Sequence, residues 1–110
     1  MYNFGDVVLV SFPFTNLQTR KQRPAVVISN KEYQQSRSDI ILMAITSQIR
    51  SPLSFGEAVI VHWSEAGLLK PSVFKPLIAT IEQAQVIKVM GQLNTKDLAA
   101  VYEVIKTITQ

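Results

Sequence analysis

The segment D-I-I-L-M-A-I-T, residues 39–46, is the most apolar run of the sequence and decides the fold that we expect. It is rich in β-branched residues, which are enriched in strands because they fit a pleated, packed surface. Polar stretches bound it on both sides, at 30–38 and 47–54. We therefore predict a strand over 39–46 between two loops.

Two similar runs lie upstream. V-V-L-V-S-F (7–12) ends at Pro13, and A-V-V-I-S (25–29) follows a polar stretch over 15–22 that we predict to be a loop. Pro24 stands directly before the second run, so the residue ahead of it is biased towards an extended backbone. Both runs are predicted strands.

Further strand candidates lie downstream of residue 54. They are G-E-A-V-I-V-H-W (56–63), S-V-F-K-P-L-I-A-T-I-E (72–82), which we expect to form one or two short strands broken near Pro76, and Q-V-I-K-V-M-G-Q-L (85–93). Several short strands at close spacing favour a sandwich or a small barrel, in which closure removes exposed strand edges. The sequence thus predicts a mainly β fold, a small barrel of antiparallel strands.

The hydrophobic period changes near the C-terminal end. Asn94 is a predicted helix N-cap, with Asp97 at the third helical position as in a capping box. Apolar residues then recur at helical spacing: Leu98, Val101, Ile105 and Ile108. Lys106 falls in the last turn, where a cation suits the helix dipole. We predict one C-terminal α-helix.

Composition limits the class of protein. The chain has 110 residues, 47% of them hydrophobic and 17% charged, which suits one domain over 1–110 with a buried core. There is no cysteine, so disulfides and thiolate metal sites are excluded, and one histidine leaves little for a metal cluster. No apolar run approaches the roughly 20 residues that span a bilayer. Since the start, M-Y-N-F-G-D, lacks a signal-peptide pattern, we expect a cytoplasmic protein without a membrane anchor.

The positive charge is unevenly distributed. Residues 1–56 carry six Lys/Arg against three Asp/Glu, whereas residues 57–110 carry five of each. The densest cluster is R-K-Q-R-P (20–24), at the start of a predicted strand. This asymmetry indicates a polyanionic partner such as nucleic acid, although chance clustering on a solvated face explains it equally well.

Several enzyme classes do not fit the sequence. One histidine and no cysteine cannot supply a Ser/His/Asp or Cys/His set, and the four glycines are too scattered for a phosphate-binding loop. The carboxylates show no D-x-D pattern of a two-metal nuclease. Metal-free RNA cleavage stays open, because the 2′-hydroxyl of RNA supplies the nucleophile and the protein need only orient the phosphate and stabilise charge.

The order of short motifs resembles the MazF/PemK family of toxins. These motifs are G-D-V-V-L-V (5–10), R-P-A-V-V-I-S (23–29), A-I-T-S (44–47), G-L-L-K-P-S-V-F-K (67–75) and G-Q-L (91–93). The resemblance covers nearly the whole chain. It implies an SH3-like barrel that forms a homodimer, cleaves single-stranded messenger RNA at selected sequences without metal or cofactor, and is held in check by a cognate antitoxin.

The resemblance assigns two catalytic residues. Arg23 matches the family's catalytic arginine and Thr46 its catalytic threonine. A guanidinium can hold two phosphoryl oxygens and stabilise a dianionic transition state, and a threonine hydroxyl can donate one hydrogen bond to a non-bridging oxygen. Because arginine stays protonated, we expect Arg23 to act as a stabiliser or acid, and no base is assigned. Without the resemblance, we would interpret Arg23 as a residue that shields a strand edge and Thr46 as an ordinary strand residue.

Seven polar residues are RNA-binding candidates: Arg20, Lys21, Gln22, Ser47, Gln48, Lys70 and Ser72. The first three lie before Arg23 and suit backbone phosphates, while Ser47 and Gln48 suit base edges. A solvated loop and a polar turn are the alternatives. One feature departs from the family: many members carry an Asp-Gln pair where this chain has Pro76-Leu77.

Two rival functions belong to other classes. A gyrase-binding toxin similar to CcdB shares the fold but uses an apolar and aromatic C-terminal tip, whereas this chain ends K-T-I-T-Q. The other rival is a non-catalytic barrel that binds RNA or a peptide. Cleavage of RNA in EDTA would separate the leading hypothesis from both.

Overall fold

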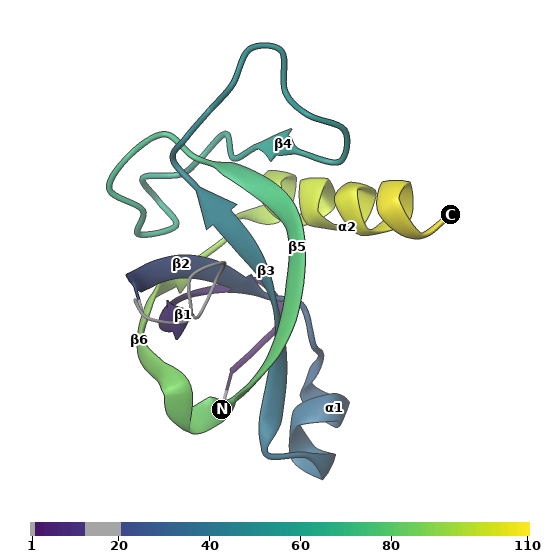
Figure 1. Cartoon of the computed structure of the whole chain (residues 1–110). Helices are drawn as coiled ribbons and strands as arrows, with labels where there is room; N and C mark the ends of the chain where they lie inside the picture. Colours follow the sequence, from purple (N-terminus) through teal and green to yellow (C-terminus); the bar gives the residue numbers. More distant parts are fainter. Residues whose placement is uncertain (1, 13–20) are drawn as a thin grey trace.

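The computed structural model describes residues 2–12 and 21–110, and within them it shows a curved sheet with a helix at the C-terminal end (Figure 1). The strands are β1 (Asp6–Phe12), β2 (Lys21–Val27), β3 (Asp39–Thr46), β4 (Ala58–Val59), β5 (Val73–Glu82) and β6 (Val86–Gln92). The helices are α1 (Lys31–Ser36), α2 (Thr95–Thr109) and the 3₁₀ turn η1 (Gln83–Gln85). The predicted mainly β fold with its C-terminal helix is confirmed. Of the helices in the described ranges, none combines the length and apolar character needed to span a membrane.

The strands form one antiparallel sheet in the order β4-β5-β3-β2-β1-β6. β5 runs along the whole of β3, from Asp39 paired with Glu82 to Thr46 paired with Val73. Figure 1 shows that the sheet curls into a barrel-like shape, with α2 across the side that carries β4 and α1 beside the start of β3. The start and the end of β3 therefore lie at opposite ends of the molecule.

Both faces of the central strands are buried. One core joins the sheet to α2 and includes Val7, Val26, Met43, Phe74, Val101 and Val104. The other lies on the opposite face and consists of Val8, Val10, Ala25, Val27, Ile40 and Leu42. Successive residues of one strand enter different cores, because side chains alternate across a strand. This explains why the sequences of the central strands are continuous apolar runs and do not alternate between apolar and polar residues.

The expected break near Pro76 is wrong, because β5 continues through it. Met43 pairs with Ile78 and Ile45 with Phe74, so three residues of β5 lie opposite Ala44 alone. This register shift is a bulge, and a bulge accepts proline because it needs no ladder hydrogen bond there. The bulge lets one long strand accommodate a residue that would interrupt regular pairing.

The predicted strand over 56–63 is mostly wrong. Only Ala58–Val59 pairs, and turns follow from residue 61 to 67. The buried carboxylate of Asp97 accepts hydrogen bonds from the backbone N–H groups of Val61 and His62, each at 2.9 Å. Asn94 caps α2 as predicted, with its side chain accepting from the N–H of Asp97 at 3.0 Å. Asp97 thus anchors the 61–67 turns to the start of α2.

Helix α1 lies in a stretch that the sequence predicts to be a loop. The side chain of Asn30 caps it by accepting from the N–H of Tyr33 at 2.9 Å, which satisfies one of the free donors of the first turn. Gln34 is buried, and its side-chain amide donates to the carbonyl of Tyr2. A single inward side chain therefore fixes this short helix, and one residue gives no periodic pattern.

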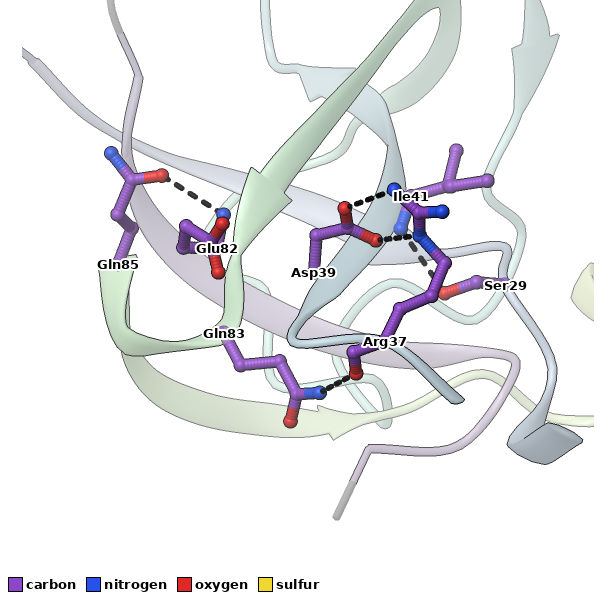
Figure 2. Close-up of polar contacts among 7 residues, drawn as sticks. All are labelled: Ser29, Arg37, Asp39, Ile41, Glu82, Gln83 and Gln85. Atoms are coloured by element: carbon purple, nitrogen blue, oxygen red, sulfur yellow. Dashed lines mark hydrogen bonds and ion pairs between the residues drawn. The ribbon is translucent and has the colours of Figure 1, made fainter. Parts of the chain in front are cut away.

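A network of polar contacts surrounds the start of β3, a region that we call the Asp39 end (Figure 2). The guanidinium of Arg37 donates twice to the carboxylate of Asp39, at 3.0 Å each. The Ser29 hydroxyl accepts from the N–H of Ile41 at 3.1 Å, and the Gln83 amide donates to the Arg37 carbonyl at 3.4 Å. These bonds link the segments that follow β2 and α1 to β3 and η1.

Two glycines let the end of the 61–67 turns touch β6. A Cβ on Gly67, whose φ is +85°, would lie 2.1 Å from the Met90 carbonyl oxygen, and a Cβ on Gly91 would lie 2.5 Å from that of Ala66. No side chain fits at such distances. The backbone of 66–67 therefore rests directly on that of 90–91.

Candidate functional site

Arg23 and Thr46 occupy corresponding positions on neighbouring strands. β2 and β3 pair in a register that sets Ala25 opposite Ala44. Arg23 and Thr46 each lie two residues beyond that pair, on the side where β3 ends, so their side chains leave the same face. Both are half-buried, and both line the same two cavities. Sequence reasoning named this pair, and the fold brings its members together.

The first of these cavities has a volume of about 330 Å³ and lies between the start of β2, the end of β3 and residues 68–72. Its lining includes most of the predicted site residues: Gln22, Arg23, Thr46, Ser47, Gln48, Lys70 and Ser72. Its apolar wall includes Leu9, Leu68 and Met90. Three polar segments that are far apart in the sequence therefore meet at one site.

The Thr46 hydroxyl is oriented by its own turn. Its oxygen accepts a hydrogen bond from the backbone N–H of Gln48 at 3.1 Å. A hydroxyl has one donor and two acceptor positions, so this bond leaves the proton available to donate. The local fold thus fixes the oxygen while keeping its donor function for a ligand.

Ser72 and Lys70 play different parts. Ser72 is buried, and its hydroxyl donates to the carbonyl of Lys70 at 2.9 Å. This bond therefore holds in place the backbone of residues 70–72, the edge of the first cavity that we call the rim. The side chain of Lys70 is exposed at the cavity, where a cation can reach a phosphate.

The two residues at the start of the cationic cluster are placed differently from the rest. Lys21 is exposed at the first position of β2 and does not line the cavities around Arg23. Arg20 lies outside the described residues. The structure therefore gathers Gln22 and Arg23 at the cavity but leaves Lys21 to one side.

The site is longer than the sequence indicates. A second cavity of about 280 Å³ is lined by Arg23, Thr46, Gln48 and Lys75, and a third of about 300 Å³ by Thr46, Gln48, Arg50 and Lys75 among others. Because neighbouring cavities share residues, we treat the three as one surface and call it the groove. Lys75, a charged residue inside the apolar run 73–79, was a signal that sequence reasoning did not use.

The described lining of the groove is electropositive. It contains the cationic side chains of Arg23, Arg50, Lys70 and Lys75, and the carboxylate of Glu57. One oxygen of Glu57 accepts from the N–H of Ser54 at 2.9 Å. A groove with an excess of cations and a wall of apolar side chains suits a phosphate chain that carries bases.

Comparisons with known proteins agree with this fold. No curated protein matches the chain. An endoribonuclease in complex with its cognate antitoxin from a mycobacterial species superposes with a TM-score of 0.78 at 13% identity, covering 97% of this chain and 93% of that one. The Mycobacterium tuberculosis toxin MazF-mt6 gives 0.72 at 19%, covering 91% of each chain, and MazE-MazF from Deinococcus radiodurans gives 0.72 at 16%, covering 97% and 93%.

A family model identifies the chain beyond its fold. Structures this distant in sequence show a shared architecture and no more. The model of the PemK-like, MazF-like toxins of type II toxin–antitoxin systems matches residues 3–109, nearly the whole sequence. It spans every strand and both helices described above. The chain belongs to this toxin family.

Proposed function

We propose that the chain is a toxin that cleaves single-stranded messenger RNA without a metal ion, and thereby arrests translation and growth. The observation that carries the proposal is the placement of Arg23 beside Thr46, in register across β2 and β3, at one cavity. One residue supplies a fork of charged donors, and the other supplies a hydroxyl whose proton is available. These groups can hold the phosphate and stabilise the charge that develops during in-line attack on a phosphodiester.

In the proposed reaction the 2′-oxygen of the RNA forms a bond to phosphorus while the bond from phosphorus to the 5′-oxygen breaks. The proton of the 2′-hydroxyl passes to solvent, since no residue is assigned as the base, and the departing 5′-oxygen takes up a proton from solvent or from Arg23 acting as the acid. The products are a 2′,3′-cyclic phosphate and a 5′-hydroxyl. Arg23 stabilises the charge that develops on the phosphoryl oxygens, and Thr46 donates to one of them.

The remaining groove residues bind and orient the substrate in this proposal. Lys70 and Lys75 attract the phosphates on either side of the scissile bond, an effect that weakens as salt is raised. Gln48 lines all three cavities and has the donor and acceptor groups to read a base edge. Ser47 and Gln22 extend this polar lining, and Lys21 and Arg20 steer the approaching strand.

We further propose that the chain, as one domain over 1–110, works as a homodimer in the cytoplasm under control of a cognate antitoxin. Solved MazE-MazF complexes from Deinococcus radiodurans and a mycobacterial endoribonuclease with its antitoxin support such a partner. Exposed apolar side chains such as Leu69 and Val89 supply contact surface for a second chain. Size-exclusion chromatography with light scattering measures the dimer.

The deciding experiment is end mapping on defined single-stranded RNA with EDTA present. We expect cleavage at selected sequences, with 2′,3′-cyclic phosphate and 5′-hydroxyl ends. A folded wild-type protein that binds RNA tightly without cutting it, in EDTA or in magnesium, would favour the non-catalytic barrel. Growth arrest with intact cellular RNA and inhibited gyrase would favour a CcdB-like toxin.

A further inference from the structure

We propose that the third cavity of the groove is a base-stacking subsite for a nucleotide next to the scissile phosphate, with Phe55 as its platform. The inference deepens the proposed function, because it takes single-stranded nucleic acid as the ligand. The cavity has a volume of about 300 Å³, at the lower end of the roughly 300–1,000 Å³ typical of small-ligand pockets. It adjoins the catalytic pair through Thr46, which lines all three cavities.

Phe55 is an aromatic side chain presented to solvent. Its exposed fraction is 79%, whereas the ring of Trp63 packs against a core. An isolated exposed apolar residue needs no explanation, but Phe55 lines a cavity that also contains Arg50 and Lys75. Aromatic rings interleaved with cations are the usual composition of sites for single-stranded nucleic acid, since bases stack on the rings and phosphates pair with the cations.

A closed turn holds Phe55 in place. The N–H of Glu57 donates to the carbonyl of Ser54 at 3.1 Å, and the N–H of Ser54 donates to the Glu57 carboxylate at 2.9 Å. Gly56 has a φ of +86°, as the third position of a type II turn requires. This turn lies in the connection between β3 and β4, at the top of Figure 1.

The turn also packs tightly against its surroundings. A Cβ on Gly56 would lie 3.0 Å from the side chain of Ile108 and 3.2 Å from that of Pro76, so little room separates the turn from α2 and β5. Phe55 therefore lies on a turn that its own hydrogen bonds and its neighbours hold in place. Little conformational entropy of the protein is then lost when a base binds.

The residues that depart from the family pattern belong to this subsite. Pro76 and Leu77 both line the third cavity. Pro76 contacts the position of Gly56, and the β5 bulge places it there. Pro76 and Leu77 thus complete the apolar part of the cavity lining, alongside the cations. This apolar lining suits the face and edge of a nucleobase better than the carboxylate of the Asp that many family members carry here.

The test uses short single-stranded 2′-deoxy oligonucleotides of mixed sequence, which lack the 2′-hydroxyl nucleophile and stay intact during a binding titration. We expect Phe55→Leu to bind this probe about tenfold more weakly than the wild type, the effect of losing one base–aromatic stack. Phe55→Tyr and Phe55→Trp should bind as tightly as the wild type. Inorganic polyphosphate, which has no bases, should bind all four proteins equally.

Tyr102→Leu is the matched control, because Tyr102 is an exposed aromatic on α2 that stacks on Phe4 at a centroid distance of 4.8 Å. It should bind the oligonucleotide like the wild type. Once a cleavage site is mapped, an abasic nucleotide beside it should weaken wild-type binding about tenfold and should not weaken Phe55→Leu further.

Equal oligonucleotide affinity of Phe55→Leu and the wild type would overturn the subsite and point to another occupant, such as a peptide. An equal loss of polyphosphate binding would also overturn it, since the effect would then not depend on a base. A wild type that binds the probe through Phe55 yet cuts no RNA contradicts the endoribonuclease and leaves the subsite standing.

Discussion

The two ends of β3 use polar side chains in opposite ways. At the Asp39 end, Arg37 donates two hydrogen bonds to Asp39, and the Ser29 hydroxyl accepts one from the backbone N–H of Ile41 (Figure 2). At the other end, Thr46 lies beside Arg23 at the wall of the groove. Internal contacts thus hold one end of the strand in place, and the groups that we propose to act on RNA lie at the other end. The expected effects of substitutions therefore separate stability from activity.

The largest expected effect comes from Arg23→Ala. Loss of the charged fork should lower kcat/KM for RNA cleavage by about 10³-fold, in the range found when one transition-state donor is removed. Arg23→Lys should recover little, because an ammonium group cannot make the two parallel bonds. Single-turnover cleavage of a defined RNA measures both.

Arg37→Ala is the matched control for that change, because Arg37 lies just before the start of β3, whereas Arg23 lies on β2 beside the end of β3. It should cleave RNA like the wild type. Wild-type activity in Arg23→Ala, or an equal loss in the two variants, would break the distinction between the two ends.

Thr46→Val should lower cleavage by about 10²-fold, since it keeps the shape of the side chain and removes the hydroxyl that we propose as a donor to phosphate. Thr46→Ser retains the hydroxyl and should stay within a few-fold of the wild type. Because the same oxygen accepts from the Gln48 N–H, a crystal structure of the valine variant checks that the turn is kept. Full activity of Thr46→Val would assign the donor elsewhere.

Asp97→Asn should destabilise the protein by about 2 kcal/mol, because one backbone N–H, at residue 61 or 62, then faces the N–H₂ of a buried amide in place of an acceptor. Urea unfolding measures the change. The 61–67 turns lead into the rim that carries Lys70, so we also expect a rise in KM larger than any fall in kcat. An unchanged unfolding midpoint would show that the turns do not depend on this carboxylate.

The smallest expected effect is a pH dependence at the Asp39 end. Hydrogen bonds from Arg37, and then from Tyr33, hold the pKa of the Asp39 carboxyl below its usual value. A carboxyl with a lowered pKa in the folded state stabilises the fold above its unfolded pKa of about 3.9, and this contribution is lost as pH falls through the folded value.

Wild type and Arg37→Ala should therefore differ slightly in thermal stability at neutral pH and converge in strong acid. The Arg37 side chain is exposed to solvent and Asp39 is only partly buried, so the difference should be small and should shrink in salt. Thermal melts from pH 7 to pH 2 measure it. A difference that grows on acidification would contradict the assignment.

The sequence predicted those parts of the fold that local pattern determines. The strands around 7–12, 25–29 and 39–46 and the helix from Asn94 follow from apolar runs and a cap. The break at Pro76 was expected because proline interrupts regular pairing, whereas the bulge that accommodates it depends on the facing strand. Asp97 was expected to close a capping box, but its partners are backbone groups more than thirty residues away.

The same reasoning applies to the site. Arg23 and Thr46 came from a resemblance, and strand register explains why they lie side by side. Lys75 and Phe55 were not predicted as site residues, because only the folding of β5 beside the 54–57 turn brings them to one cavity. Isolated polar or aromatic residues gain a role when the sheet assembles, and no local pattern encodes that.

The contact between Gly67 and Gly91 bears on how members of this family are recognised. Both glycines stand in motifs that carry the resemblance, G-L-L-K-P and G-Q-L, and each is needed so that two backbones can touch. That requirement is steric and would persist in a descendant whose groove had lost Arg23. These motifs therefore report the architecture of the family, whereas the proposed cleavage of RNA depends on Arg23 and Thr46, which this backbone contact does not require.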